Sequence, residues 1–295
     1  MSLFTGSGVA LVTPMQADGS VNFPVLKELL EFQVENGTDA IIICGTTGEA
    51  STMTDEEQIE TVRFTAETIA KRIPVLAGAG SNDTAHAIAL AKGCQKAGAD
   101  GVLLVTPYYN KATQKGLVKH YTAIANNLDV PVILYNVPGR TGVNIAPKTC
   151  YELSKVENIV GIKEASGNFT NITQIAALCG SDFDLYSGND DQNVPILSLG
   201  GKGIISVLAN VAPKDCHDMV AKFFAGDTKG AAELQLKSIE LINALFCEVN
   251  PIPVKTALNL MGFHVGPCKL PLCEMEESNL ERLKKAMQNY GLTLS

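Results

Sequence analysis

The chain has 295 residues, of which 46% are hydrophobic and 18% are charged, and its formal net charge at pH 7 is −8. This composition excludes an intrinsically disordered chain and leaves room for a large core. The acidic balance argues against a nucleic-acid partner, and the length is ordinary for an α/β barrel.

Short apolar runs recur along the chain, and each is followed by a segment with the spacing of an amphipathic helix. Strands that alternate with helices in this way predict a closed (β/α)8 barrel of parallel strands, the TIM barrel, with an open doubly wound sheet as the second candidate. The predicted strands are residues 8–12, 40–44, 74–77, 101–105, 131–136, 159–163, 183–187 and 203–207.

Helix signals agree with this division. Thr54 opens a capping box for a helix that runs to about residue 72, and Pro147 and Pro213 each suit the first position of a helix. Beyond residue 226 the pattern changes to helices without strands, over residues 229–247, 253–261 and 276–290. We therefore predict a barrel catalytic domain at 1–225 and a C-terminal helical appendage at 226–295, with residues 250–253 as a rigid hinge.

Lys163 stands at the carboxyl end of the sixth predicted strand, where barrel enzymes carry their chemistry. Gly161 shares its strand face and is expected to leave space beside the amine. An amine stripped of water loses its proton more easily and can attack a carbonyl carbon to form an imine. The alternative is a lysine whose stem lies on apolar surface and whose head reaches water, the usual situation for a lone lysine.

Two further strand ends carry polar residues. In the Gly-Thr-Thr-Gly-Glu loop at 45–49, amides and hydroxyls could hold a carboxylate or form a threonine-capped structural turn, and Glu49 is expected to brace neighbouring loops. After the fifth strand, Pro138-Gly139 predicts a type II turn that directs Arg140 toward a substrate carboxylate or into a surface salt bridge. Tyr135 is either a core residue or a proton carrier.

The sequence predicts no metal site. Asp190 is interpreted as a helix N-cap, and the glycines at 200–203 lack the spacing of a phosphate loop. The four histidines are widely separated, and the eight cysteines contain no Cys-x-x-Cys pair, so we interpret the cysteines as reduced core residues. The first four residues show no export signal and no apolar run reaches bilayer length, which predicts a cytoplasmic protein.

Five segments together resemble the dihydrodipicolinate synthase family of pyruvate-dependent class I aldolases. They are Gly-Thr-Thr-Gly-Glu at 45–49, Thr-Pro-Tyr-Tyr-Asn at 106–110, Tyr-Asn-Val-Pro-Gly-Arg at 135–140, Gly-Ile-Lys-Glu at 161–164 and Asn-Pro-Ile-Pro-Val-Lys at 250–255. The resemblance implies condensation of pyruvate with L-aspartate-4-semialdehyde to 4-hydroxy-tetrahydrodipicolinate, the first committed step of lysine and diaminopimelate synthesis.

Other readings stay open beside this one. N-acetylneuraminate lyases and keto-deoxy-sugar-acid aldolases share the lysine and tyrosine, and Thr46 and Arg140 separate the chain from them. A barrel that has lost catalysis would be expected to have a broken lysine, tyrosine or arginine position, and none is broken here. A phosphate-binding barrel would require a clearer glycine loop than residues 200–203.

The resemblance also implies roles for single residues. Lys163 would form the imine with pyruvate, so that no cofactor is needed. Tyr135 would be the proton shuttle, linked through the Thr47 hydroxyl to Tyr109, which in the family comes from a neighbouring subunit. The resemblance implies a homotetramer built as a dimer of tight dimers, whereas the residues themselves leave a dimer and a tetramer both open.

Substrate-binding roles follow in the same way. The resemblance implies that the amides of Thr46 and Thr47 hold the pyruvate carboxylate and that Arg140 binds the carboxylate of the semialdehyde. Gly188 and Ile205 would line the site through their backbone.

One departure from the family concerns regulation. The resemblance indicates a vestigial lysine-binding site at Ser51, Asn82, His86 and Tyr108. His86 stands where lysine-inhibited relatives have an acidic residue, while Asp55 and Gln58 stand at their histidine positions. A histidine offers no negative charge to a lysine ammonium, so we expect weak or absent inhibition by lysine.

Overall fold

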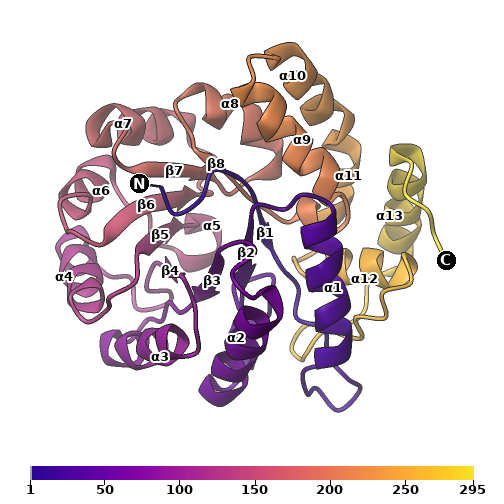
Figure 1. Ribbon diagram of the computed structural model, residues 1–295, viewed down its shortest axis with the longest axis horizontal. Coiled ribbons are helices and arrows are strands. Elements are labelled where there is room, and N and C mark those ends of the chain that lie inside the picture. The colour runs from indigo at the N-terminus through magenta and orange to yellow at the C-terminus, as the bar shows by residue number, and fades with distance from the viewer. Residues whose placement is uncertain (1) are drawn as a thin grey trace.

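The computed structural model describes residues 2–295 and shows a closed barrel of eight parallel strands in sequence order (Figure 1). All eight predicted strands are confirmed, with ends that shift by one or two residues, and the open sheet is excluded. The strands are β1 (Gly6–Ala10), β2 (Ala40–Ile43), β3 (Val75–Gly78), β4 (Gly101–Val105), β5 (Val132–Asn136), β6 (Ile159–Glu164), β7 (Asp184–Ser187) and β8 (Gly203–Ser206). Met1, part of the stretch used to predict no export signal, lies outside the described residues.

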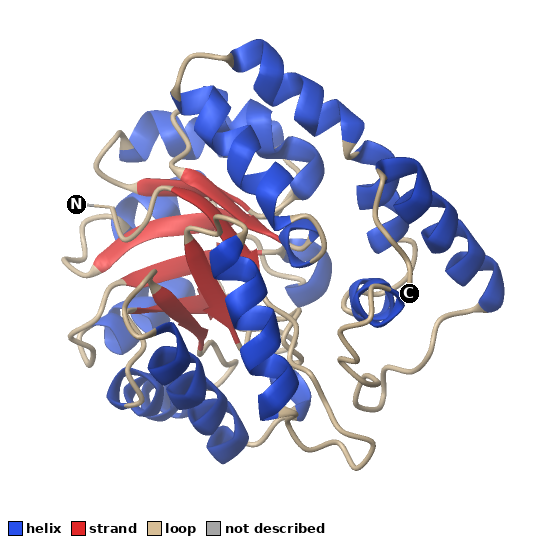
Figure 2. Cartoon of the chain, turned by 45° about the vertical axis from the view of Figure 1, so that its right-hand side comes forward, coloured by secondary structure: helices blue, strands red, loops and turns tan. Residues whose placement is uncertain are grey.

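Helices surround the strands on the outside of the barrel (Figure 2). Thr54 caps α2 as predicted, but α2 ends at Ile69 because Ala70 and Lys71 adopt left-handed backbone angles. The longer helices of the barrel are α1 (Phe23–Glu35), α2 (Asp55–Ile69), α3 (Thr84–Lys96), α4 (Gln114–Ala125), α6 (Pro147–Leu153), α7 (Phe169–Cys179), α8 (Asn193–Ser198) and α9 (Pro213–Phe224). Short turns of helix are η1 (Ala50–Thr52), α5 (Pro138–Thr141), η2 (Asp190–Gln192) and η3 (Leu208–Asn210).

The C-terminal appendage consists of α10 (Thr228–Lys237), α11 (Ile239–Leu245), α12 (Ile252–Leu260) and α13 (Glu277–Tyr290). The single helix predicted at 229–247 is two helices that meet at Ser238. In Figure 1 the appendage lies at one side of the barrel, with α13 farthest from the strands. The exact division at residue 225 stays a prediction. Among residues 2–295 no helix is both long enough and apolar enough to cross a bilayer.

The interior of the barrel is a packed apolar core rather than a channel. Phe4 stacks on Tyr186 at the amino-terminal end, with ring centroids 4.4 Å apart. The buried residues of this interior are Phe4, Ala10, Ala40, Ile42, Leu76, Leu103, Ile133, Tyr135, Val137, Tyr186 and Ile205. Because side chains fill the interior, polar chemistry is confined to the carboxyl ends of the strands.

A buried ion pair joins the appendage to the barrel. Lys255 Nζ of α12 lies 2.7 Å from Glu49 Oε1 in the loop after β2, and both side chains are almost fully buried. The second Glu49 oxygen accepts the backbone N–H of Lys269 at 2.7 Å, and Lys255 also donates to the Pro267 carbonyl. The predicted bracing role of Glu49 is therefore confirmed.

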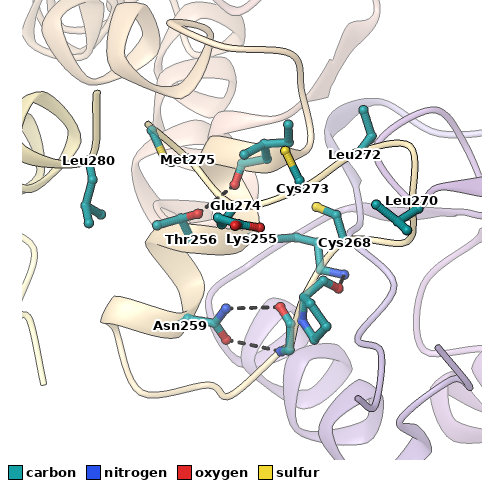
Figure 3. Close-up of a pocket in the computed structure, with 13 residues that line it drawn as sticks. Lys255, Thr256, Asn259, Cys268, Leu270, Leu272, Cys273, Glu274, Met275 and Leu280 are labelled. Atoms are coloured by element: carbon teal, nitrogen blue, oxygen red, sulfur yellow. Dashed lines mark hydrogen bonds between the residues drawn. The ribbon is translucent and has the colours of Figure 1, made fainter. Parts of the chain in front are cut away.

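Beside this ion pair, α12 and the segment before α13 enclose a hollow of about 320 Å³ (Figure 3). Asn259 closes one side of the hollow by exchanging two hydrogen bonds with Gly266. Cys268 and Cys273 both line it, and both are free thiols.

We expect Lys255→Met to lower the free energy of unfolding by about 3–5 kcal/mol, because it leaves the buried Glu49 carboxylate without its charged partner. Urea denaturation at one protein concentration measures the change. The matched control is Lys284→Met, which removes an ion pair to the exposed Glu281 and should change stability by about 0–1 kcal/mol. An equal loss of unfolding free energy in the two variants would show that the buried pair stabilises the fold no more than an exposed pair does.

Candidate active site

Lys163 lies at the centre of the candidate site, at the carboxyl end of β6. The strand register places it between Tyr135 of β5 and Tyr186 of β7, and its side chain is 5% exposed. Its Nζ atom lies 4.4 Å from the centre of the Tyr135 ring. The surface-lysine alternative is therefore excluded, since the head of Lys163 is buried.

The glycine that makes room for Lys163 is Gly188. A Cβ atom at Gly188 would lie 3.0 Å from Lys163 Cε, whereas one at Gly161 would meet the Asp184 carbonyl oxygen at 2.5 Å. Gly161 is thus required by the close approach of β7, and the space that it was expected to leave beside the amine stays a prediction.

Burial lowers the pKa of Lys163 to about 8. The negative charge of Asp190 opposes this effect, and the positive charge of Arg140 adds to it. At neutral pH the amine is therefore neutral in an appreciable fraction of molecules, which an imine-forming lysine requires.

Tyr135 is buried beside the amine, and burial raises the pKa of its phenol. The positive charge of Arg140 and the polar side chain of Thr46 both lower the pKa of Tyr135 and so oppose this effect. The Thr47 hydroxyl accepts a hydrogen bond of 3.0 Å from Asn250 Nδ2. Thr46 is thus the threonine whose side chain acts on Tyr135, and the relay through Thr47 stays a prediction.

The loop at residues 45–49 is a tight turn with two backbone amides that have no backbone partner. Gly48 packs so closely on the Cys44 backbone that a Cβ there would lie 3.1 Å away, and its carbonyl accepts from the Thr13 hydroxyl at 2.7 Å. Within residues 2–295 neither the Thr46 nor the Thr47 amide donates a hydrogen bond to another backbone carbonyl. Both amides are therefore available to a carboxylate, and their binding of pyruvate stays a prediction.

Arg140 lies on the helical turn α5 rather than on a type II turn. Pro138 occupies the first turn of α5, and Gly142 ends it in a left-handed conformation, so the predicted Pro-Gly turn is wrong. The Arg140 side chain is exposed, and its Nη2 donates a 3.1 Å hydrogen bond to the Asn250 carbonyl. No salt bridge engages it among residues 2–295, so the guanidinium can receive a substrate carboxylate.

Two predicted lining positions lie in the barrel wall. Gly188 donates its amide to the Glu164 carbonyl and packs on Lys163, and Ile205 is fully buried on β8. Tyr109 is different, because its side chain is 89% exposed on the loop after β4. The structure does not bring Tyr109 to Lys163 within one chain, and its shared role with a neighbouring copy stays a prediction.

One cavity of about 390 Å³ connects the candidate active site with the predicted vestigial regulatory site. Thr46, Tyr135 and Arg140 line it. Its other polar or aromatic lining residues include Ser51, Asp55, Gln58, His86 and Tyr108.

His86 and Asp55 are paired in the regulatory part of this cavity. His86 Nε2 lies 2.8 Å from Asp55 Oδ1, and its Nδ1 lies 3.0 Å from the Ser81 hydroxyl. Asn82 donates to the Tyr108 carbonyl at 3.2 Å. The sequence-predicted residues are therefore close together, with the acidic group of Asp55 already engaged.

The comparisons with known proteins agree with this geometry. The model of the "Dihydrodipicolinate synthetase family" matches residues 3–290. This chain belongs to that family.

Among curated relatives, this family member is 58% identical over 293 residues to 4-hydroxy-tetrahydrodipicolinate synthase of Clostridium novyi, covering 99% of each chain. It is 59% identical to the enzyme of the same name from Lachnoclostridium phytofermentans, covering 99% of this chain and 100% of the relative. A crystal structure of dihydrodipicolinate synthase from Thermotoga maritima superimposes with a TM-score of 0.97 at 43% identity, covering 99% of this chain and 100% of that one.

Sequence reasoning assigned the wrong role to Asp190 in this family member. Asp190 is buried as the first residue of η2, and its Oδ2 accepts backbone N–H groups from Val207 at 3.0 Å and Leu208 at 2.9 Å. Asp190 therefore accepts hydrogen bonds from the N–H groups at the start of the distant η3 turn, and the prediction that it caps its own helix is wrong. Its buried negative charge raises the pKa of Lys163. In the sequence, the acidic pair Asp190-Asp191 was the one sign of a charged group here.

The pH dependence of imine formation should follow the pKa of Lys163. Only the neutral amine attacks pyruvate, so the initial rate of imine formation should rise about tenfold from pH 6 to pH 7 and level off above a midpoint of about 8. Rapid mixing with pyruvate and cyanoborohydride, followed by mass spectrometry, measures the rate. In Asp190→Asn the midpoint should move to lower pH, because a negative charge that favours the ammonium is lost. A midpoint near 10.5 in the parent enzyme would contradict the desolvation argument.

Proposed function

We propose that this chain is a 4-hydroxy-tetrahydrodipicolinate synthase that condenses pyruvate with L-aspartate-4-semialdehyde. The observation that carries the proposal is the buried Lys163 amine, whose pKa is lowered to about 8 beside Tyr135. The names of the curated relatives, at 58–59% identity over nearly the whole chain, support the same activity. The product enters lysine and diaminopimelate synthesis.

The reaction uses Lys163 as a covalent electron sink. The neutral amine attacks the keto carbon of pyruvate, and loss of water leaves a protonated imine. The positive nitrogen makes the methyl protons removable, and the resulting enamine adds to the aldehyde carbon of the second substrate. The amine of that substrate then attacks the imine carbon, which closes the ring and releases Lys163 as a free amine. The covalent imine supplies the activation, so we propose no cofactor and no metal.

Each stage of this reaction moves a proton, and Tyr135 is the group placed to carry it. Its phenol lies beside Lys163, and the Thr46 side chain acts on its pKa, so we propose that the proton passes between these two hydroxyl groups. We propose that Tyr109 of a neighbouring copy extends this path, in agreement with the high exposure of Tyr109 in one chain. We propose that the assembly is a homotetramer built from tight dimers. We also propose that the enzyme is located in the cytoplasm.

Binding of the two substrates is divided between two groups. The free amides of Thr46 and Thr47 receive the pyruvate carboxylate, while Arg140 receives the carboxylate of the semialdehyde at the mouth of the site. The alternative is another pyruvate-dependent aldolase, such as an N-acetylneuraminate lyase or a keto-deoxy-sugar-acid aldolase. Thr46 and Arg140 favour the synthase over these.

We expect pyruvate to be consumed with L-aspartate-4-semialdehyde but not with N-acetylmannosamine or keto-sugar aldehydes, in a coupled assay of each pair. Lys163→Ala should lower turnover about 10³-fold or more and abolish the adduct trapped by borohydride and pyruvate. Lys229→Ala, at an exposed lysine of α10, is the matched control and should keep both signals. If pyruvate were consumed with a sugar aldehyde but not with L-aspartate-4-semialdehyde, the proposed second substrate would be wrong. If no pyruvate were trapped on the parent enzyme, the imine mechanism would be wrong.

We also propose that lysine inhibits this enzyme weakly or not at all. Asp55 stands at a position where lysine-inhibited relatives have histidine, and its carboxylate is already bonded to His86. His86 itself offers no anion to an incoming ammonium group. At these two positions, Asp55 and His86, the cavity therefore offers no free carboxylate to bind the ammonium group of lysine.

Steady-state rates should accordingly stay unchanged when millimolar lysine is added at fixed substrate concentrations. The double variant Asp55→His with His86→Glu returns the family pattern at these two positions and should gain sensitivity to lysine. Potent inhibition of the parent enzyme by lysine would refute this expectation.

A further inference from the structure

Asn250 lies where the appendage meets the mouth of the barrel, and it contacts both proposed substrate sites. Its side-chain Nδ2 donates to Thr47 Oγ1 at 3.0 Å. Its main-chain carbonyl accepts from Arg140 Nη2 at 3.1 Å. Because Asn250 is only 5% exposed, its contact with the buried Thr47 is shielded from competition by water, while the contact with Arg140 is partly buried.

The contact with Thr47 fixes the pyruvate side of the site. Thr47 is 3% exposed, so its hydroxyl has little access to solvent and depends on a protein partner. That partner comes from the appendage, more than two hundred residues along the chain. Holding the Thr47 side chain also holds the amides of Thr46 and Thr47, since they belong to the same tight turn.

The contact with Arg140 fixes the semialdehyde side. Arg140 extends from the four-residue helix α5 into an exposed position, where a long side chain samples many rotamers. Its bond to the Asn250 carbonyl is its one hydrogen bond through the side chain among residues 2–295. The guanidinium is therefore oriented from the appendage rather than from the barrel.

We propose that Asn250 is a positioning residue that holds the two substrate sites in register, through its side chain for pyruvate and through its main-chain carbonyl for the second substrate. This inference rests on the proposed function, which assigns the 45–49 loop to pyruvate and Arg140 to the semialdehyde.

Two further observations support this role over simple packing. The Oδ1 atom of Asn250 is buried without a hydrogen-bond partner in the described chain, an arrangement that costs stability and that a small apolar residue would avoid. In addition, Lys255 anchors the same segment to Glu49, so the position of Asn250 relative to the 45–49 loop is fixed at a second point.

Because one contact uses the side chain and the other the main chain, Asn250→Ala separates them. The variant loses the bond to Thr47 but keeps the carbonyl that orients Arg140. We expect the KM for pyruvate to rise about tenfold, the cost of one buried hydrogen bond, while the KM for L-aspartate-4-semialdehyde changes less than about twofold.

Asn259→Ala is the matched control. Asn259 is another partly buried asparagine of the appendage, and its side chain bonds only to Gly266 and to neither Thr47 nor Arg140 (Figure 3). It should affect thermal stability without separating the two KM values. Thr47→Val removes the hydroxyl partner, so its effect and that of Asn250→Ala on pyruvate binding should not add in the double variant.

The outcomes are distinct. The positioning role would be overturned by an unchanged KM for pyruvate in Asn250→Ala, or by additive effects in the double variant. It would also be overturned if Asn250→Ala changed both KM values equally, as Asn259→Ala is expected to do. Borohydride trapping at saturating pyruvate shows independently that each variant is folded and forms the imine. If the parent enzyme traps no pyruvate the proposed function fails, whereas a trapped parent without the KM separation removes only the role of Asn250.

Discussion

The buried ion pair of Glu49 and Lys255 is the constraint on which the mouth of the barrel depends. Two opposite charges removed from water are stable only when their remaining hydrogen-bonding capacity is satisfied. Here both Glu49 oxygens are used, by Lys255 and by the Lys269 amide, and Lys255 donates a further bond to the Pro267 carbonyl. Since these groups come from three separate segments, the loop after β2 cannot move without disturbing the appendage.

This arrangement gives the appendage a part in the site although it carries none of the reacting groups. The strands supply Lys163 and Tyr135 from the barrel wall, where the apolar interior removes water from the amine. The strand-end loop and α5 supply the groups that we propose bind carboxylates, and these are the parts that a barrel alone would leave mobile. Asn250 and Lys255 contact them from outside, so the contacts join the helices beyond residue 226 to the proposed site.

The strands and Lys163 could be predicted because buried parallel strands are apolar runs, and a lysine at the end of such a run stands out. The residues that the prediction misplaced lie where periodicity carries no information. Gly161 and Gly188 look alike in sequence, but the atoms that exclude a Cβ come from Asp184 of the neighbouring strand for Gly161 and from Ala165 and Lys163 for Gly188. Whether Thr46 or Thr47 faces Tyr135 depends on the turn and on Asn250, which is distant in sequence.

The desolvation that activates Lys163 has a consequence for stability. The folded pKa of about 8 lies below the ordinary value of 10.5, so between these values the unfolded chain binds more protons than the folded one. The free energy of unfolding therefore rises with pH across this window, and below about pH 8 the folded state carries the full cost, roughly 3 kcal/mol. Asp190 reduces this cost by favouring the ammonium, and for the same reason it keeps more of the amine protonated at neutral pH. The buried carboxylate thus sets a balance between a stable barrel and a reactive lysine. The two requirements conflict at this one residue, and the packing of the barrel and its appendage offsets the cost.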